Sequence, residues 1–87
     1  MSEKRIQWEK FSTEVDNHVD NYVVKQYGDF PDAMIESFSV DDIKRELNRY
    51  IHRAGKNSRG HIEDIRDCLK IAHYACYLKQ KLVEKEK

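Results

Sequence analysis

The side chains best suited to chemistry are charged, and they gather between positions 42 and 67. Arg49, Arg53 and Lys56 are spaced four and three residues apart, so on a helix they share one face. Arg59 follows in a polar turn that leads into a predicted helix, whose first N–H groups attract anions. These four side chains are therefore candidates for binding a phosphate group. The alternative is a solvated surface on which they pair with three nearby carboxylates: Glu46, Glu63 and Asp67.

Acidic side chains of the same stretch are candidate metal ligands. Glu63 and Asp67 are four residues apart and Asp64 and Asp67 are three apart, so each pair lies on one helical face. Asp42 and Glu46 form a further pair on the preceding predicted helix. Mg²⁺ prefers oxygen ligands and often needs only one or two carboxylates beside substrate phosphates. A Mg²⁺ site that holds a nucleotide is therefore one hypothesis for this stretch.

The alternative for these carboxylates is structural. Glu63 and Asp64 would complement the positive end of the helix dipole, and Asp67 would pair with Lys70 or Arg66. The sequence has no CxxC motif, no glycine-rich phosphate loop and no nucleophile elbow. No cofactor is therefore predicted beyond this Mg²⁺ hypothesis, and catalysis is not the leading interpretation.

Helical periodicity predicts the elements that would position these residues. Apolar residues recur every three or four positions, and no segment alternates like a strand. We predict an all-α fold with three main helices at about 3–27, 40–54 and 60–82, and a short helical turn near 31–37. Gly28, Pro31, Gly55 and Gly60 mark the breaks. The last two helices should form an antiparallel hairpin within a single domain spanning 1–87, with a frayed tail at 83–87.

Each predicted helix has an apolar stripe. Ser39 and Asp42 resemble a capping box that starts the helix at about 40–54. Its expected buried stripe consists of Ile43, Leu47, Tyr50, Ile51 and Ala54. The apolar face expected for the last helix consists of Ile62, Ile65, Leu69, Ala72, Ala75, Cys76 and Leu82.

Four further apolar residues precede the capping box. They are either ordinary core or a candidate surface for a partner or a second copy of the chain. These residues are Phe30, Met34, Ile35 and Phe38.

Composition narrows the classes of partner. The 87 residues include 16 Lys and Arg against 16 Asp and Glu, and this balance gives no overall field that would attract polyanions. A helix-turn-helix would also place Glu63, Asp64 and Asp67 near phosphates, which argues against a nucleic-acid partner. No apolar run approaches the ~18–20 residues that span a bilayer, which argues against a membrane partner. The first residues lack the apolar stretch of a signal peptide, so we expect a cytoplasmic protein.

The stretch from Asn48 to Leu82 resembles small, phage-associated helical domains of unknown function. Their pattern is roughly Lys-Tyr-Ile-x-Arg-Ala, a Lys/Gly turn, then Glu-Asp-Leu, Lys-Ala and Tyr-Leu. The matching positions are Tyr50, Ile51, Arg53, Ala54, Lys56, Glu63, Asp64, Lys70, Ala72, Tyr74 and Leu78. The resemblance covers about two-fifths of the chain and implies a helical domain without a stated activity.

A more distant similarity is to the all-helical nucleotide pyrophosphatases of the MazG type. That family holds Mg²⁺ with a Glu-x-x-Glu pair and a later Glu-x-x-Asp pair. Asp64 and Asp67 match the spacing of the second pair, whereas Asp42 and Glu46 are one residue too far apart for the first. This resemblance implies a Mg²⁺-dependent nucleotide-binding or pyrophosphatase-like protein.

The leading interpretation is a non-catalytic binding or oligomerisation module, with a homodimer as the candidate assembly. The Mg²⁺-dependent nucleotide protein is the alternative, and nucleic-acid binding is a weaker one.

Overall fold

The structure is a computed structural model that describes residues 2–29 and 32–85, and every regular element in these ranges is helical. The all-α prediction is therefore confirmed. Contacts between Cα atoms divide the chain into two compact units, Met1–Asp32 and Ala33–Lys87, and each is described by itself. The single domain expected over 1–87 stays a prediction.

The first unit is one helical path with three parts. It consists of α1 (Glu3–His18), a π-helical segment η1 (Val19–Val23) and α2 (Val24–Tyr27). Ser2 starts α1 by accepting a hydrogen bond from the backbone N–H of Arg5 on its hydroxyl oxygen (3.1 Å). Gly28 follows α2 with a positive φ of 84°, a conformation that glycine adopts without a Cβ clash. The predicted helix at 3–27 therefore has the right ends.

The π-helical segment is a feature that the sequence analysis did not predict. The N–H of Val24 donates to the carbonyl of Val19, five residues back, where an α-helix would bond four residues back. Val19, Val23 and Val24 are β-branched and lower the local α-helix propensity. The wider turn rotates the side chains after it relative to those before it.

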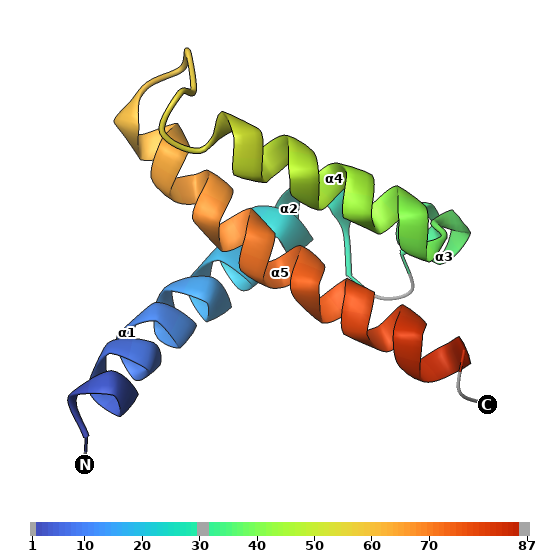
Figure 1. Cartoon of the computed structure of the whole chain (residues 1–87), viewed down its shortest axis with the longest axis horizontal. Helices are drawn as coiled ribbons and strands as arrows, with labels where there is room; N and C mark the ends of the chain where they lie inside the picture. Colours follow the sequence, from blue (N-terminus) through green and yellow to red (C-terminus); the bar gives the residue numbers. More distant parts are fainter. Residues whose placement is uncertain (1, 30–31, 86–87) are drawn as a thin grey trace. The chain divides into compact units, whose positions relative to one another are not determined.

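The second unit contains the predicted hairpin (Figure 1). A short helix α3 (Ala33–Ser37) precedes α4 (Val40–Arg53), and α5 (His61–Lys85) follows. Arg53, at the end of α4, contacts Asp67, near the start of α5, whereas Tyr50, one turn earlier in α4, contacts Tyr74. The order of these contacts makes α4 and α5 antiparallel, as predicted.

The helices of the hairpin begin and end where the sequence predicts, except at the end of α5. Ser39 and Asp42 form the predicted capping box, in which each side chain accepts a hydrogen bond from the other's backbone N–H (3.1 and 2.9 Å). α5 continues through Lys85, so the end predicted near Leu82 and the tail predicted from residue 83 are set too early. No glycine or proline interrupts this stretch, and Glu and Lys are good helix formers. Residues 86–87 lie outside the described part.

The polarity of the hairpin interface differs from expectation. Asp67 of α5 is fully buried (0% exposed), whereas Ile62 of the same helix is 72% exposed. The predicted buried stripe of α4 holds for Ile43 and Tyr50, which are buried, but is wrong for Ile51, which is 55% exposed. Ile51 is turned about 100° away from Tyr50 around the helix axis, so the two side chains cannot face α5 together.

The reason lies in which side of α5 meets α4. Asp67, Lys70 and Tyr74 recur every three or four residues and contact α4 side chains. Ile71 and Leu78 share that side of the helix and are half-buried. Other apolar residues lie on the opposite side of α5, which we call the α5 apolar face. Its members are Ile62, Ile65, Leu69, Ala72, Cys76 and Val83, and Cys68 and Ala75 lie along one edge of it.

Candidate functional site

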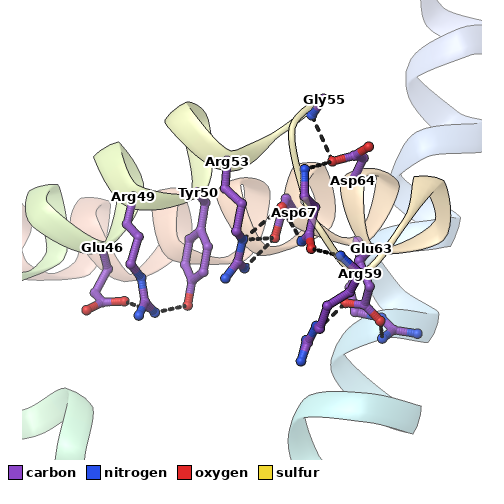
Figure 2. Close-up of polar contacts among 11 residues, drawn as sticks. Glu46, Arg49, Tyr50, Arg53, Gly55, Arg59, Glu63, Asp64 and Asp67 are labelled. Carbon is purple, nitrogen blue, oxygen red and sulfur yellow. Dashed lines mark hydrogen bonds and ion pairs between the residues drawn. The ribbon is translucent and has the colours of Figure 1, made fainter.

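The buried carboxylate of Asp67 is the centre of the charged stretch (Figure 2). The guanidinium group of Arg53 donates to both of its oxygens: Nε lies 3.2 Å from Oδ1 and 3.0 Å from Oδ2, and Nη2 lies 2.5 Å from Oδ1. Such a two-pronged contact matches the planar fork of arginine to a carboxylate. The side chain of Arg53 is 33% exposed, so the pair lies at the edge of the hairpin interface.

Asn57 is a second residue that donates a hydrogen bond to the carboxylate of Asp67, and the sequence analysis did not identify it. The side-chain amide of Asn57 donates to Asp67 Oδ2 (3.1 Å), and its Oδ1 accepts from the N–H of Arg59 (2.9 Å). Asparagine commonly bonds in this way to the backbone two residues ahead in a turn. The position of Asn57 between two glycine breaks was the available signal, but it predicted only a turn.

Asp64 connects the α4–α5 link to the start of α5. Its Oδ1 accepts hydrogen bonds from the backbone N–H groups of Gly55 (2.9 Å) and Asn57 (2.8 Å), as Figure 2 shows for Gly55. Gly55 has a positive φ of 82° there, which suits a glycine after a helix end. Asp64 therefore holds the link by hydrogen bonding, in addition to the dipole role expected from its place in the first turn of α5.

The hydrogen bonds determine the charge state of Asp67. Burial by itself would raise the pKa of this carboxyl, but donation from Arg53 and Asn57 outweighs it and holds the pKa below its usual range. Lys70 experiences the opposite environment. Burial and the neighbouring charge of Arg53 lower the pKa of its ammonium group, although Asp67 partly opposes them.

Aromatic rings extend the interface beyond the ion pair. The ring centroids of Tyr50 and Tyr74 lie 5.4 Å apart in an edge-to-face arrangement. Burial, followed by the neighbouring Tyr50, raises the pKa of the Tyr74 hydroxyl. Three cationic side chains also lie near the ring of Tyr50. The distance from the charged group to the ring centroid is 5.1 Å for Arg49, 5.3 Å for Arg53 and 5.5 Å for Lys70. Around Asp67 and Tyr50, the α4–α5 contact is therefore a mixture of aromatic and charged groups.

The four predicted phosphate-binding cations do not converge on one empty site. Arg53 is engaged by Asp67, and Arg49 donates to Glu46 (2.6 Å) and to the hydroxyl of Tyr50 (3.2 Å). Arg59 donates to Glu63 (3.3 Å), and the exposed Lys56 lies in the link. Three of the four thus pair with the carboxylates that the alternative interpretation named.

The five predicted metal ligands are also separated. Asp42 belongs to the capping box and accepts from Arg45 (3.2 Å), and Glu63 accepts from both Arg59 and Arg66. Glu46, Asp64 and Asp67 have the partners given above. Across residues 2–29 and 32–85, no group of three or more His, Cys, Asp or Glu side chains is placed to hold a metal ion. The paired carboxylates are close in sequence, but they already accept hydrogen bonds from basic side chains or from backbone N–H groups.

The predicted apolar partner surface before the capping box is divided. Met34 is exposed and Phe38 is half-buried, whereas Ile35 is buried. Neighbouring residues on a helix point about 100° apart, so Met34 and Ile35 cannot share one exposed face. Ile35 therefore belongs to the core, which was the alternative to a partner surface, and it is no longer a candidate for that surface. Phe30 lies outside the described residues.

Comparison of the chain with protein-family models, curated proteins and solved structures finds no match. The two resemblances noted from the sequence therefore stay predictions. Within the described ranges, none of the helices has both the length and the apolar character needed to cross a bilayer.

The most unusual exposed surface of the second unit is the α5 apolar face. Ile62 and Ile65 are 72% and 48% exposed, and Val83 is also exposed at its other end. Between them, Cys68, Cys76 and Ala75 are exposed, and Leu69 and Ala72 are half-buried. Contiguous apolar surface of this kind is typical of interaction sites, whereas isolated exposed apolar residues are ordinary.

Proposed function

We propose that this chain is a non-catalytic binding or oligomerisation module that uses the α5 apolar face. The observation that carries this proposal is the exposure of large apolar side chains on α5, while the charged Asp67 of the same helix is fully buried. Ordinary folding would bury Ile62 and Ile65 before Asp67, because the burial of a charge is costly and the burial of an isoleucine is favourable. An exposed apolar face is therefore better explained by a partner.

The small core supports the same proposal. Among the described residues, the buried apolar side chains are Ile35, Ile43 and Tyr50. A chain of 87 residues has little surface to bury on its own, and association is one way to bury more. The cytoplasmic location predicted from the sequence belongs to this proposal.

The experiment compares alanine substitutions at exposed and buried isoleucines. At protein concentrations below 1 µM, on the order of a weak interface's Kd, association is minimal and stability reports the isolated chain. Ile62→Ala and Ile65→Ala should change the free energy of unfolding by less than about 0.5 kcal/mol. The matched substitution Ile43→Ala should cost about 2–5 kcal/mol.

Chemical unfolding followed by circular dichroism measures these differences. If Ile62→Ala and Ile65→Ala cost as much as Ile43→Ala, the α5 apolar face is part of the core and the proposed function is wrong. Alkylation of Cys68 and Cys76 by a maleimide under the same dilute conditions gives a second readout. Rapid modification of both thiols is expected, because both side chains are exposed.

A Mg²⁺-dependent nucleotide protein remains the alternative proposal. It would require Asp64 and Asp67 to exchange their present hydrogen bonds for a metal ion. No feature of the described residues favours it over the binding module.

A further inference from the structure

A cavity of about 520 Å³ lies between the start of α4 and the end of α5, at the end of the hairpin opposite the α4–α5 link (Figure 1). Charged side chains of both helices line it, together with the aliphatic side chains of Val40 and Leu82. Sites for small molecules commonly have this volume. We infer that the cavity binds a small organic anion, which carries a carboxylate or phosphate group beside a short apolar part. None of the residues that line it belongs to the α5 apolar face.

The positive charge of the cavity comes from both helices. Lys44 belongs to α4, whereas Lys81 and Lys85 are four residues apart on α5 and lie on one side of that helix. Asp41 and Glu84 line the same cavity. None of the ion pairs among the described residues joins any of these five side chains. An anion that enters the cavity can therefore contact ammonium groups without displacing a carboxylate from them.

Lys81 is the lysine of this cavity whose position is most restricted. It is half-buried, which is uncommon for lysine. Its Nζ donates a hydrogen bond to the backbone carbonyl of Glu36 in α3 (3.1 Å). An ammonium group has several donor hydrogens, so this bond leaves donors for a ligand. A charge that is already held in place loses little freedom when an anion binds to it.

The remaining side chains limit which anions fit. Val40 is half-buried and Leu82 is 46% exposed, and together they offer an apolar contact beside the lysines. A ligand with an apolar part should therefore bind more tightly than inorganic phosphate. Asp41 and Glu84 repel negative charge, so a molecule with one or two charges is favoured over a polyanion such as a nucleoside triphosphate.

An NMR titration of the full chain tests the site, with benzoate and phenyl phosphate as separate probes and sodium chloride at the same ionic strength as the reference. The backbone amides of residues 39–44 and 81–85 should shift in a saturable way. The dissociation constant should be on the order of 1 mM, since contacts between exposed charges are weak. The tighter probe identifies the preferred anionic group. Benzyl alcohol, which has the ring but no charge, should give no saturable shift.

Single substitutions connect the shifts to the cavity. Lys44→Gln and Lys81→Gln should each raise the dissociation constant about threefold, on the order of what one exposed ion pair contributes. Lys81→Gln also removes the donor to the carbonyl of Glu36, whereas Lys44 has no such bond, so its substitution changes the charge alone. Lys79→Gln is the matched control, because Lys79 is exposed on the same helix but does not line the cavity. Its dissociation constant should equal that of the wild-type protein.

Three results would overturn the inference. The first is the absence of saturation with both probes at about 50 mM, far above the expected dissociation constant. The second is a Lys79→Gln effect as large as that of Lys44→Gln, which would indicate attraction to the surface charge as a whole. The third is binding that is unchanged when Lys44 and Lys81 are both replaced by glutamine. Each of these results leaves the proposed function standing, since that function depends on Ile62 and Ile65.

Discussion

Arg53 and Asp67 form a two-pronged ion pair between helices that run in opposite directions, fourteen residues apart in sequence. The side chain of Asp67 is fully buried and that of Arg53 is two-thirds covered. Buried ion pairs are costly to desolvate, so their net contribution to stability is small, but the removal of one partner leaves an uncompensated charge. The α4–α5 contact therefore depends on both residues together.

We predict that Arg53→Ala destabilises the protein by about 3 kcal/mol, because Asp67 would stay buried without its main donor. Arg53→Lys should recover only part of this loss, since an ammonium group cannot donate in the two-pronged geometry. Chemical unfolding at neutral pH measures both values.

The paired replacement Arg53→Met with Asp67→Leu is the control for that experiment. It removes both charges at once, so its cost should be well below that of Arg53→Ala. A double variant that is less stable than Arg53→Ala would show that the ion pair is not the reason for the loss.

Stability should fall in acid through Asp67. Its pKa is lowered in the folded protein, so its contribution is complete above the unfolded value of about 3.9 and is lost as the pH falls through the folded value. The difference in unfolding free energy between the wild-type protein and Asp67→Asn should therefore shrink below about pH 4.

The pKa of the Asp42 carboxyl is also lowered, so its contribution to the loss of stability in acid needs a control of its own. The backbone and hydroxyl groups of Ser39 lower the pKa of the Asp42 carboxyl. Measured on an Asp42→Asn background, the acid dependence that remains should be assignable to Asp67. A difference between wild-type and Asp67→Asn proteins that stays constant from pH 7 to about pH 2 would contradict the described hydrogen bonds.

Asp64→Ala should loosen the α4–α5 link. The N–H groups of Gly55 and Asn57 would lose their acceptor, at a cost of about 1–2 kcal/mol. Asp64→Asn keeps an acceptor oxygen at this position and should cost less. Hydrogen exchange of the two amides, measured by NMR, should accelerate in Asp64→Ala, whereas Asp16→Ala on the exposed side of α1 should leave both rates unchanged.

Mg²⁺ and nucleoside triphosphates should leave the melting temperature unchanged. The carboxylates and three of the four cations that would form such a site are already paired within the hairpin. A shift that requires both Mg²⁺ and nucleotide, and that disappears in Asp64→Asn, would instead support the nucleotide-binding alternative.

The hairpin was predictable from the sequence because its signals are local. Ser39 and Asp42 mark the start of α4, and Gly55 marks the turn after it, so the ends of this helix depend on neighbours in the chain. The carboxylate partners of Arg49, Arg53 and Arg59 were also among the pairings that the sequence allowed.

The face on which α4 and α5 meet was not predictable in the same way. Apolar periodicity indicates which residues share a side of a helix, but it does not say that the side will be buried. Here Arg53 and Asn57 satisfy Asp67 from outside its own helix; the sequence allowed the pairing of Arg53 with Asp67, but it did not indicate that Asp67 would be buried in the α4–α5 contact or that Asn57 would donate to it. The π-helical segment was equally hidden, because β-branched residues indicate a weak helix rather than a wider turn.

The polar hairpin contact also limits how far α5 can slide along α4. A shift of one turn, about 5.4 Å, in one direction would bring Glu63 to Arg53 and keep a carboxylate there, but would pull Asp64 away from the α4–α5 link. A shift in the other direction would bring Lys70 towards Arg53 and set two positive charges together. Sliding is therefore unfavourable in both directions. The positions of Ile62 and Ile65 of α5 relative to α4 are fixed as a result.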